Sequence, residues 1–276
     1  MKKSFERAQR RREEGHGYKH DLGQNFLYDD ALLEELVQST GVTKADSVLE
    51  IGPGSGMLTK HLCPHAGKVL AVEVDHDIIP FLKVNTAAFS NLEIVEGDIR
   101  KQNLRELCAP LGENFLVIAN IPYNITTPIF EALWESGLSI RQISVMIQKE
   151  VAEKLMAAPS TAAYGLMSVK CQYYCTPRLE CIVPAEKFTP PPKVDSAFVH
   201  LEMNRCRSAE VQNERRLFSL LRAGFNLRRK TLSNALRSVV EPDALRAAME
   251  QAEISPTARA EELSVDDWIR LSNACP

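Results

Sequence analysis

The stretch SVLEIGPGSG, from Ser47 to Gly56, decides the fold of this 276-residue chain. Its apolar first half, residues 47–51, predicts a buried strand, and residues 57–62 behind the glycines predict a helix. Glycines let the backbone approach a ligand closely, and the N-terminus of a helix offers free amide donors. A strand, a glycine-rich turn and a helix in this order are typical of nucleotide-binding α/β domains. The spacing is GxGxG, however, and not the GxGxxG of dinucleotide enzymes.

Strands and helices alternate outward from this stretch. Apolar residues at helical spacing predict a helix over residues 29–40, which Gly41 ends, and an amphipathic helix over residues 148–156. From about Pro177 the pattern changes to short strands, and after residue 205 it is helical throughout. The further strands are predicted over residues 68–72, 92–95, 115–119, 143–147, 178–183 and 196–203. This alternation predicts an α/β fold followed by a helical C-terminal part.

Acidic residues stand at the ends of two of the predicted strands. Glu73 lies 17 positions beyond Gly56, where doubly wound folds carry an acid that binds both ribose hydroxyls. Asp98 follows the next strand and is placed to accept a hydrogen bond from an adenine amine of a cofactor; a plain turn is the alternative. Together with Gly52 and Gly54, these acids predict a site for a nucleoside-containing cofactor.

The tetrapeptide Asn120-Ile121-Pro122-Tyr123 follows the apolar run over residues 115–119. The lone pair of an aromatic amine is delocalised, and two hydrogen-bond acceptors would favour its nucleophilic, pyramidal geometry. The side-chain carbonyl of Asn120 and the backbone carbonyl of Pro122, or one close to it, could supply them. The ring of Tyr123 could stack on the base. Taken alone, the tetrapeptide favours a turn that leaves a strand and buries a Tyr beneath it, and only its context favours a base-binding site.

Composition limits the classes of protein to which the chain can belong. With 45% hydrophobic and 25% charged residues it is a globular chain long enough for one large and one small domain. No apolar run approaches the roughly 18 residues of a membrane span, and we expect a cytoplasmic protein without membrane contact. The seven Cys are scattered and lack metal-ligand spacing, so reduced thiols and no metal are expected.

The net charge of −3 is unevenly distributed. Residues 1–20 hold seven Lys or Arg against three Glu, and residues 205–240 hold nine Lys or Arg against two Glu. Two basic segments on an acidic body are what a phosphate-binding surface requires, although solvated helix faces explain either segment alone. Within the second segment, Arg228, Arg229 and Lys230 lie in a stretch with helical character. We expect at least two of them to bind RNA phosphates, while one Arg could instead pair with an acid.

Six motifs in order make the chain resemble the ribosomal RNA adenine dimethyltransferases, and the bacterial small-subunit group in particular. The resemblance extends over nearly the full length. The motifs are LGQNFL (Leu22 to Leu27), EIGPGSG (Glu50 to Gly56), NIPYNITTPI (Asn120 to Ile129), MIQKEVAEKL (Met146 to Leu155), FTPPPKVDSAF (Phe188 to Phe198) and FNLRRKTLSNAL (Phe225 to Leu236). It implies a Rossmann-like domain with a seven-stranded sheet, which uses S-adenosylmethionine, and a small C-terminal helical domain.

The resemblance also implies boundaries and roles. Residues 1–20 would form a basic extension, residues 21–204 the methyltransferase domain, and residues 205–276 the RNA-binding helical domain. Phe188 would stack on the adenine opposite Tyr123, although burial at a domain junction explains it equally well. The substrate would be two adjacent adenines near the 3′ end of small-subunit RNA, within a pre-ribosomal particle, and the enzyme would be a monomer. The residues implied to line the cofactor site are Asn25, Leu27, Gly52, Glu73, Asp98 and Asn120.

One position departs from the small-subunit pattern. The residue after Tyr123 is commonly Tyr in that group but is Asn124 here, and NIPYN also resembles the large-subunit enzymes that confer macrolide resistance. The longer motifs around residues 188–198 and 225–236 favour the small-subunit group. Two other classes remain as alternatives: an RNA-binding assembly or transcription factor without catalysis, and a nicotinamide-dependent oxidoreductase. The latter explains neither NIPY nor the basic segments.

Overall fold

The computed structural model describes residues 25–204 and 210–276, which divide into two compact units. The first unit comprises residues up to Lys149 together with Leu179–Leu201, and the second comprises Glu150–Arg178 and Glu202–Pro276. The predicted basic extension, residues 1–20, lies outside the described residues. The predicted domain boundary at residues 204 and 205 stays a prediction, and packing places residues 150–178 with the C-terminal helices.

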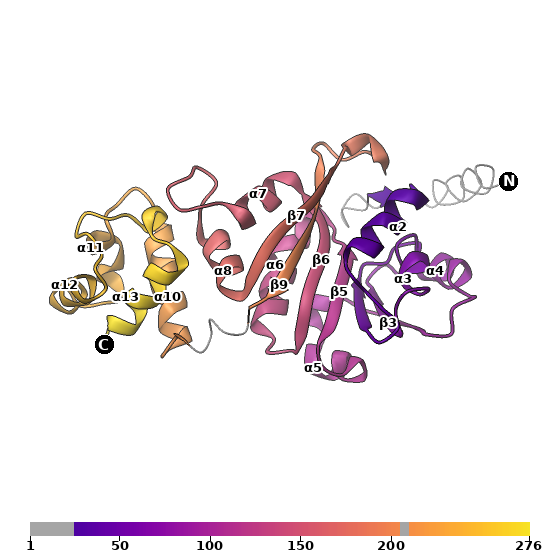
Figure 1. Cartoon of the computed structure of the whole chain (residues 1–276), viewed down its shortest axis with the longest axis horizontal. Helices are drawn as coiled ribbons and strands as arrows, with labels where there is room; N and C mark the ends of the chain where they lie inside the picture. The colour runs from indigo at the N-terminus through magenta and orange to yellow at the C-terminus, as the bar shows by residue number, and fades with distance from the viewer. Residues whose placement is uncertain (1–24, 205–209) are drawn as a thin grey trace. The chain divides into compact units, whose positions relative to one another are not determined.

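A seven-stranded sheet carries the fold, as the sequence predicted (Figure 1). Its strand order is β4-β3-β2-β5-β6-β9-β7, and β2 lies parallel to both β3 and β5. A separate pair, β1 with β8, joins Leu27 to Phe188. The strands are β1 (Phe26–Leu27), β2 (Ser47–Ile51), β3 (Lys68–Glu73), β4 (Leu92–Glu96), β5 (Phe115–Asn120), β6 (Ile140–Gln148), β7 (Cys175–Val183), β8 (Phe188–Thr189) and β9 (Ser196–Met203).

The central strands are buried on both faces. Every residue of β5 from Phe115 to Ala119 is at most 1% exposed, and Val48, Leu49 and Val69 are fully buried. Near-continuous apolar runs of this kind are what parallel strands covered by helices require. The described helices of the first unit are α2 (Asp30–Ser39), α3 (Thr59–Leu62), α4 (Ile79–Asn85), α5 (Leu104–Cys108) and α6 (Thr126–Glu135).

Helix α2 illustrates how local sequence sets the boundaries of an element. The carboxylate of Asp29 accepts a hydrogen bond from the Leu32 amide at 3.2 Å and caps the N-terminus. Leu33, Leu36 and Val37 form the buried stripe, and Gly41 turns the chain away with a φ of 69°. The predicted range of residues 29–40 therefore holds within one residue at either end.

The second unit has its own core, formed by helices that are distant in sequence. Tyr164 and Tyr173 from residues 150–178 pack in one cluster with Leu217, Leu221 and Trp268. Gly224 is required there, because a Cβ at that position would lie 2.7 Å from the Trp268 ring. The helices of this part are α7 (Lys149–Met156), α8 (Leu166–Tyr174), α10 (Glu214–Asn226), α11 (Leu232–Ala235), α12 (Pro242–Gln251) and α13 (Val265–Ala274).

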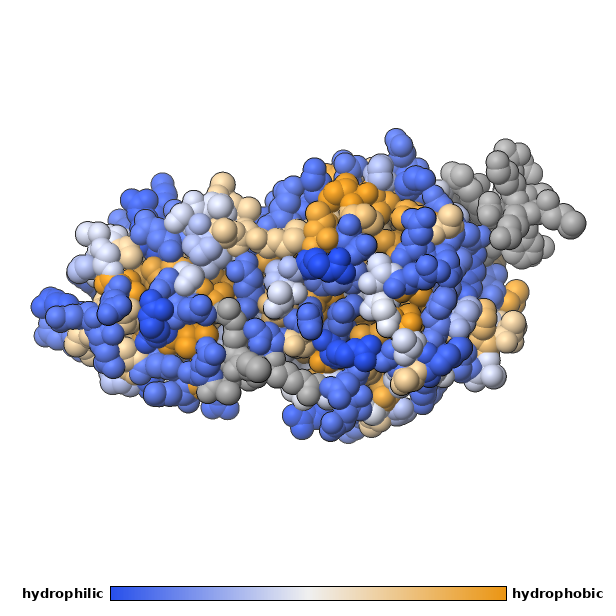
Figure 2. Space-filling view, viewed as in Figure 1, coloured by the Kyte–Doolittle hydropathy of each residue, from blue (hydrophilic) through white to orange (hydrophobic). Residues whose placement is uncertain are grey.

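The described surface mixes polar and apolar side chains. Figure 2 shows hydrophilic residues over most of the visible face, with hydrophobic residues between them. Leu179 and Ile182 of β7, each 40% exposed, are among the large apolar side chains that reach solvent. Of the helices that the structure describes, none combines the length and the apolarity needed to cross a bilayer.

Candidate active site

A cavity of about 290 Å³ opens where the parallel strands β2, β3, β4 and β5 end. Ligand sites in open α/β sheets lie outside the carboxyl ends of the strands, so the position is the expected one. The structure brings nine of the predicted site residues together around this cavity, and their individual roles stay predictions. They are Asn25, Leu27, Gly52, Gly54, Glu73, Asp98, Asn120, Pro122 and Tyr123.

The glycine-rich turn forms one wall of the cavity. Gly52 and Gly54 have φ values of 66° and 57°, a conformation that L side chains rarely adopt. A Cβ on Gly54 would also lie 2.7 Å from the Phe26 ring. The turn therefore needs glycine for its backbone conformation and, at Gly54, for space.

Glu73 connects the turn to the end of β3. Its side chain is buried, and its two oxygens accept hydrogen bonds from the backbone amides of Gly54, at 2.9 Å, and Asp75, at 2.8 Å. Burial raises the pKa of this carboxyl, while the two amide contacts act in the opposite direction. Each carboxylate oxygen can accept a further hydrogen bond, which leaves capacity for the ribose contact predicted from the sequence.

Asp98 is already engaged by a neighbour that the sequence did not indicate. Its two oxygens accept hydrogen bonds from Arg100 Nε at 2.9 Å and Arg100 Nη2 at 2.7 Å. This contact lowers the pKa of Asp98 below its usual range. Arg100 is the only Lys or Arg among the described residues that line the cavity, and Asp98 neutralises it. An adenine amine that binds Asp98 would have to share this carboxylate with Arg100.

Asn120 is oriented by the chain segment that precedes α2. Its Nδ2 donates a hydrogen bond to the backbone carbonyl of Asn25 at 3.0 Å. An amide side chain has one donor end and one acceptor end, so this contact leaves Oδ1 as its acceptor. The carbonyl of Pro122 accepts hydrogen bonds from the Ile125 amide at 3.2 Å and the Thr126 hydroxyl at 3.4 Å. A second amine acceptor at Pro122 would therefore compete with two existing contacts.

Tyr123 has a partner that sequence reasoning missed. Its hydroxyl makes a short hydrogen bond with the hydroxyl of Ser196, the first residue of β9. Ser196 is fully buried. Burial raises the pKa of the Tyr123 phenol. The ring that was expected to stack on a base is thus anchored at its hydroxyl end. Ser196 lies within the FTPPPKVDSAF motif, but nothing in a single sequence connects it to residue 123.

Phe188 is not among the residues that line the cavity, and its stacking role stays a prediction. Its side chain is 2% exposed and packs in the hydrophobic cluster that contains Leu27, Leu33 and Phe198. The pairing of β8 with β1 holds it there, opposite Leu27. In this structure Phe188 is a core residue of the first unit.

Glu50 is the most unusual polar group at the site. It lines the cavity, yet its side chain is 1% exposed and neither carboxylate oxygen has a hydrogen-bond partner among the described residues. Buried polar atoms without partners are rare in native proteins and call for a ligand or water. S-adenosylmethionine carries a sulfonium and an ammonium group, so an acidic cavity with an unpaired buried carboxyl fits this cofactor.

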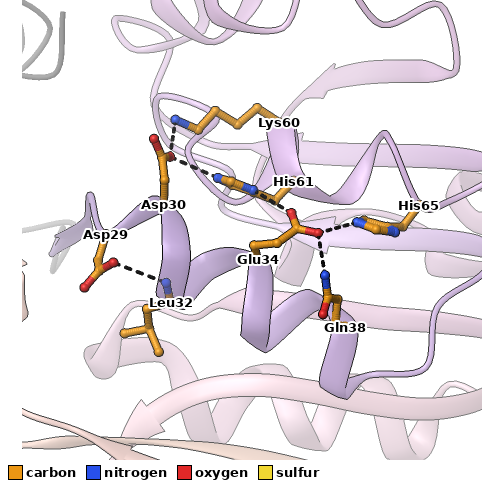
Figure 3. A network of polar contacts seen from close by, with 8 residues as sticks. All are labelled: Asp29, Asp30, Leu32, Glu34, Gln38, Lys60, His61 and His65. Carbon is orange, nitrogen blue, oxygen red and sulfur yellow. Dashed lines mark hydrogen bonds and ion pairs between the residues drawn. The ribbon is translucent and has the colours of Figure 1, made fainter. Parts of the chain in front are cut away.

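A network of charged residues connects α2 to α3 and the segment after it (Figure 3). Glu34 accepts hydrogen bonds from His61, His65 and Gln38, and His61 also contacts Asp30 at 3.0 Å. The two ring nitrogens of His61 thus each contact a carboxylate, one from Glu34 and one from Asp30. The contact with His61 is the main cause that lowers the pKa of Glu34 to about 2. No group of three or more His, Cys, Asp or Glu side chains in the described residues is arranged to hold a metal ion.

The basic cluster of the second unit is not helical. Helix α10 ends at Asn226, and Arg228, Arg229 and Lys230 lie in the turn before α11, so the prediction from helical geometry was wrong. Arg228 makes a short ion pair with Glu261 and donates to the Ala162 carbonyl at 3.2 Å. All three cations are exposed, and neither Arg229 nor Lys230 has a salt bridge with any residue that the structure describes. Two cations therefore remain available to a phosphate backbone.

Known proteins resemble the chain over nearly its full length. The model of the ribosomal RNA adenine dimethylase family matches residues 15–275. The ribosomal RNA small subunit methyltransferase A of Ligilactobacillus salivarius is 42% identical over 265 residues, which cover 93% of this chain and 90% of that protein. A dimethyladenosine transferase from Plasmodium falciparum has a similar crystal structure, with a TM-score of 0.73 and 27% identity over 89% of this chain and 95% of that one.

The 23S rRNA methyltransferase ErmE shares the fold, with a TM-score of 0.67, 24% identity, and coverage of 91% of this chain and 99% of that one. At this identity the likeness concerns the fold alone. The match to the family model instead extends without interruption over the glycine-rich turn, the NIPY segment and the C-terminal helices. The chain belongs to the ribosomal RNA adenine dimethylase family, whose members use S-adenosylmethionine.

Proposed function

We propose that this protein transfers methyl groups from S-adenosylmethionine to the exocyclic amines of two adjacent adenines near the 3′ end of small-subunit ribosomal RNA. Membership of the dimethylase family and the 42% identity to a small-subunit methyltransferase support this assignment. The observation that carries it is the cavity itself. An amide acceptor, an aromatic ring and three acids, from the ends of β2, β3, β4 and β5, surround one space of cofactor size.

The residues that would hold the cofactor divide into three groups. Glu73 can accept hydrogen bonds from the ribose hydroxyls, and Asp98 can accept one from the adenine amine. At Gly52 and Gly54, the absence of side chains lets the backbone of the turn approach the ligand closely. Two more lining residues come from the start of the described chain: Leu27 belongs to β1, and Asn25 directly precedes it. When bound, S-adenosylmethionine supplies an electrophilic methyl group on a positively charged sulfur.

The protein's part in the reaction is to orient the target amine. Asn120 Oδ1 would accept one amine hydrogen, and a backbone carbonyl at or beside Pro122 would accept the other. Tyr123 would stack on an adenine that has been flipped or splayed out of the RNA. Orientation of this kind contributes up to roughly 7–11 kcal/mol in well-aligned systems. No strong base is needed, because the amine becomes acidic once it is alkylated.

The RNA would be held partly by the second unit. Arg229 and Lys230 are exposed cations whose charge is not used by a salt bridge with a described residue. Contacts to phosphates position an RNA without reading its sequence. The cellular substrate would be a pre-ribosomal small subunit in the cytoplasm, and the protein would act on it as a monomer.

Mapping of methylated adenines tests the assignment directly. Undermethylated small subunits are incubated with the protein and S-adenosylmethionine, and dimethyladenosine is located by primer extension or mass spectrometry. Two adjacent modified adenines near the 3′ end are expected, and undermethylated large subunits serve as the matched control. Modification of the large-subunit RNA alone would overturn the small-subunit assignment, and tight particle binding without any methylation would favour a purely RNA-binding role.

A further inference from the structure

Glu50 is a buried carboxyl that the proposed mechanism does not use. It belongs to β2, which ends at the glycine-rich turn, and both of its oxygens lack hydrogen-bond partners among the described residues. The hydroxyls of Ser55 and Thr59, in the segment that follows, are buried without hydrogen-bond partners as well. Buried polar atoms without partners are rare, so Glu50, which lines the cavity, marks a place where the occupant of the cavity matters.

The neighbours of Glu50 do not compensate its charge. Glu73, at the end of β3, is itself acidic and raises the pKa of Glu50. The Thr59 hydroxyl of α3 lowers this pKa by polar attraction, although its position does not give a full hydrogen bond. Burial raises the pKa of the Cys63 thiol after α3, so this thiol stays neutral and adds no charge. The charge of Lys44 lowers the pKa of Cys63 slightly against the effect of burial. Its ammonium group donates hydrogen bonds to the backbone carbonyls of Cys63 and Ala66. Arg100, the one cation among the described lining residues, is held by Asp98.

Burial is the main reason that the pKa of Glu50 rises to about 8. Below that pH, the carboxyl of the empty cavity therefore carries a proton. A cation that enters the cavity favours the ionised form and expels this proton. Methyl transfer converts the sulfonium to a neutral thioether, so the cofactor carries one positive charge more than its product, S-adenosylhomocysteine.

We propose that Glu50 is a proton-linked counter-charge, which loses its proton to solvent when S-adenosylmethionine binds and regains it once the sulfur has become neutral. This inference rests on the proposed function. It makes Glu50 a specificity-determining residue, because ionisation favours the charged cofactor over the neutral product at the same site. Product release would then be assisted by proton uptake from solvent.

Calorimetric titration of the full-length protein tests the proposal without reference to turnover. Binding is measured at pH 7 in two buffers with different ionisation enthalpies, and the difference gives the number of protons released. A pKa of about 8 predicts close to one proton released per S-adenosylmethionine and clearly fewer per S-adenosylhomocysteine. Between pH 6 and pH 7 the Kd for S-adenosylmethionine should fall by up to about tenfold, while that for the product changes less.

Three variants assign the proton. Glu50→Gln keeps the shape of the side chain but cannot ionise, so proton release and the pH dependence of Kd should both disappear. Glu73→Gln tests the neighbouring carboxyl, which already has two amide donors and should not be the source. Glu93→Gln, at a half-exposed residue of β4 paired with Lys68, is the matched control and should behave as wild type.

Several results would overturn the proposal. They are equal proton release with cofactor and product, no proton release with either, or release that survives Glu50→Gln and disappears in Glu73→Gln. The comparison of the two ligands on the wild-type protein is decisive even if Glu50→Gln fails to fold. Absence of any S-adenosylmethionine binding would instead overturn the proposed function, and this inference with it.

Discussion

The amide of Asn120 has two chemically different ends, and the fold occupies only one of them. Nδ2 donates to the Asn25 carbonyl, so Oδ1 is left for the substrate amine. Asn120→Ala should reduce kcat by about 10²–10³-fold, because it removes an acceptor whose interaction strengthens as the amine becomes pyramidal. Single-turnover methylation of undermethylated particles measures the effect.

The control for this variant is an Asn outside the cavity. Asn103 caps α5 from an exposed position, so Asn103→Ala should lose some stability and keep its rate. A wild-type rate for Asn120→Ala would remove Asn120 from the chemistry. Loss of S-adenosylmethionine binding in the same variant, with kcat unchanged at saturation, would limit its role to the cofactor.

The hydrogen bond between Tyr123 and Ser196 predicts a specific pattern of non-additivity. Tyr123→Phe and Ser196→Ala each remove the same hydrogen bond and keep the ring, so both should lower kcat/KM by a similar, modest factor of about 3–10. The double variant should be no worse than either single one. Tyr123→Ala should be far more damaging because stacking is abolished. Additive effects of the two conservative variants would show that Ser196 does not position Tyr123.

At the scale of elements, the network between α2 and α3 predicts how stability depends on pH. The pKa of Glu34 is lowered to about 2 in the folded protein, below the ordinary Glu value. A depressed carboxyl pKa gives stability that is present above the unfolded value and lost as pH falls towards the folded one. The Tm difference between wild type and Glu34→Gln should therefore be full above about pH 5 and shrink steadily as the pH falls towards 2.

Glu35→Gln provides the comparison for this measurement. Glu35 is the next residue on α2 but is exposed, and it takes no part in the network shown in Figure 3. Its substitution should leave the acid limb of the Tm curve unchanged. A difference between wild type and Glu34→Gln that persists at pH 2 would mean that packing of the side chain, and not its charge, stabilises the two helices.

In the turn after α10, Arg228 has a structural role, whereas Arg229 and Lys230 have no salt bridge with a described residue. Arg228→Ala should lower the Tm of the protein, because it removes the interactions with Glu261 and the Ala162 carbonyl. Arg229→Ala combined with Lys230→Ala should leave the Tm unchanged and weaken RNA binding. For every phosphate that is no longer neutralised, the slope of log K against log salt should decrease by about 0.7–0.9. An unchanged slope would place the RNA elsewhere on the protein.

This turn also shows what a single sequence does not reveal. The strand ranges were predictable because each is a short apolar run between polar or glycine-rich segments, and β2 and β5 match their predictions within one residue. The strand-end acids were predictable because parallel strands bring their carboxyl ends together. The end of α10, the pair Tyr123 with Ser196 and the burial of Phe188 depend on tertiary contacts, which local patterns do not encode.

At the scale of the whole molecule, the packing of residues 150–178 predicts the result of truncation. Lys170 of α8 is 5% exposed, and its ammonium lies 5.5 Å from the centre of the Phe218 ring of α10. A chain ending at residue 204 would lack Phe218 and the remaining helices of the C-terminal core. Tryptic cleavage after Lys170 should therefore accelerate by at least about tenfold. Lys68 of β3, in the first unit, is the internal reference.

Equal cleavage rates at Lys170 in the truncated and full-length proteins would show that residues up to 204 fold independently. This would support the simple boundary predicted from the sequence. Binding of an apolar dye gives a second readout, because the truncated chain should expose Tyr164 and Tyr173, which the C-terminal helices otherwise cover.

The lining of the cavity also determines which nucleotides the protein must ignore. Three carboxyl groups, those of Glu50, Glu73 and Asp98, stand around a glycine-rich turn, and the single lining cation among the described residues is already paired. Related folds use such turns to hold the phosphates of dinucleotides. Here an entering phosphate would find no unpaired cation among the described lining residues, so its charge would stay uncompensated. The cavity therefore discriminates against ATP and nicotinamide dinucleotides by the charge of their phosphates, in addition to selecting a phosphate-free nucleoside by its contacts.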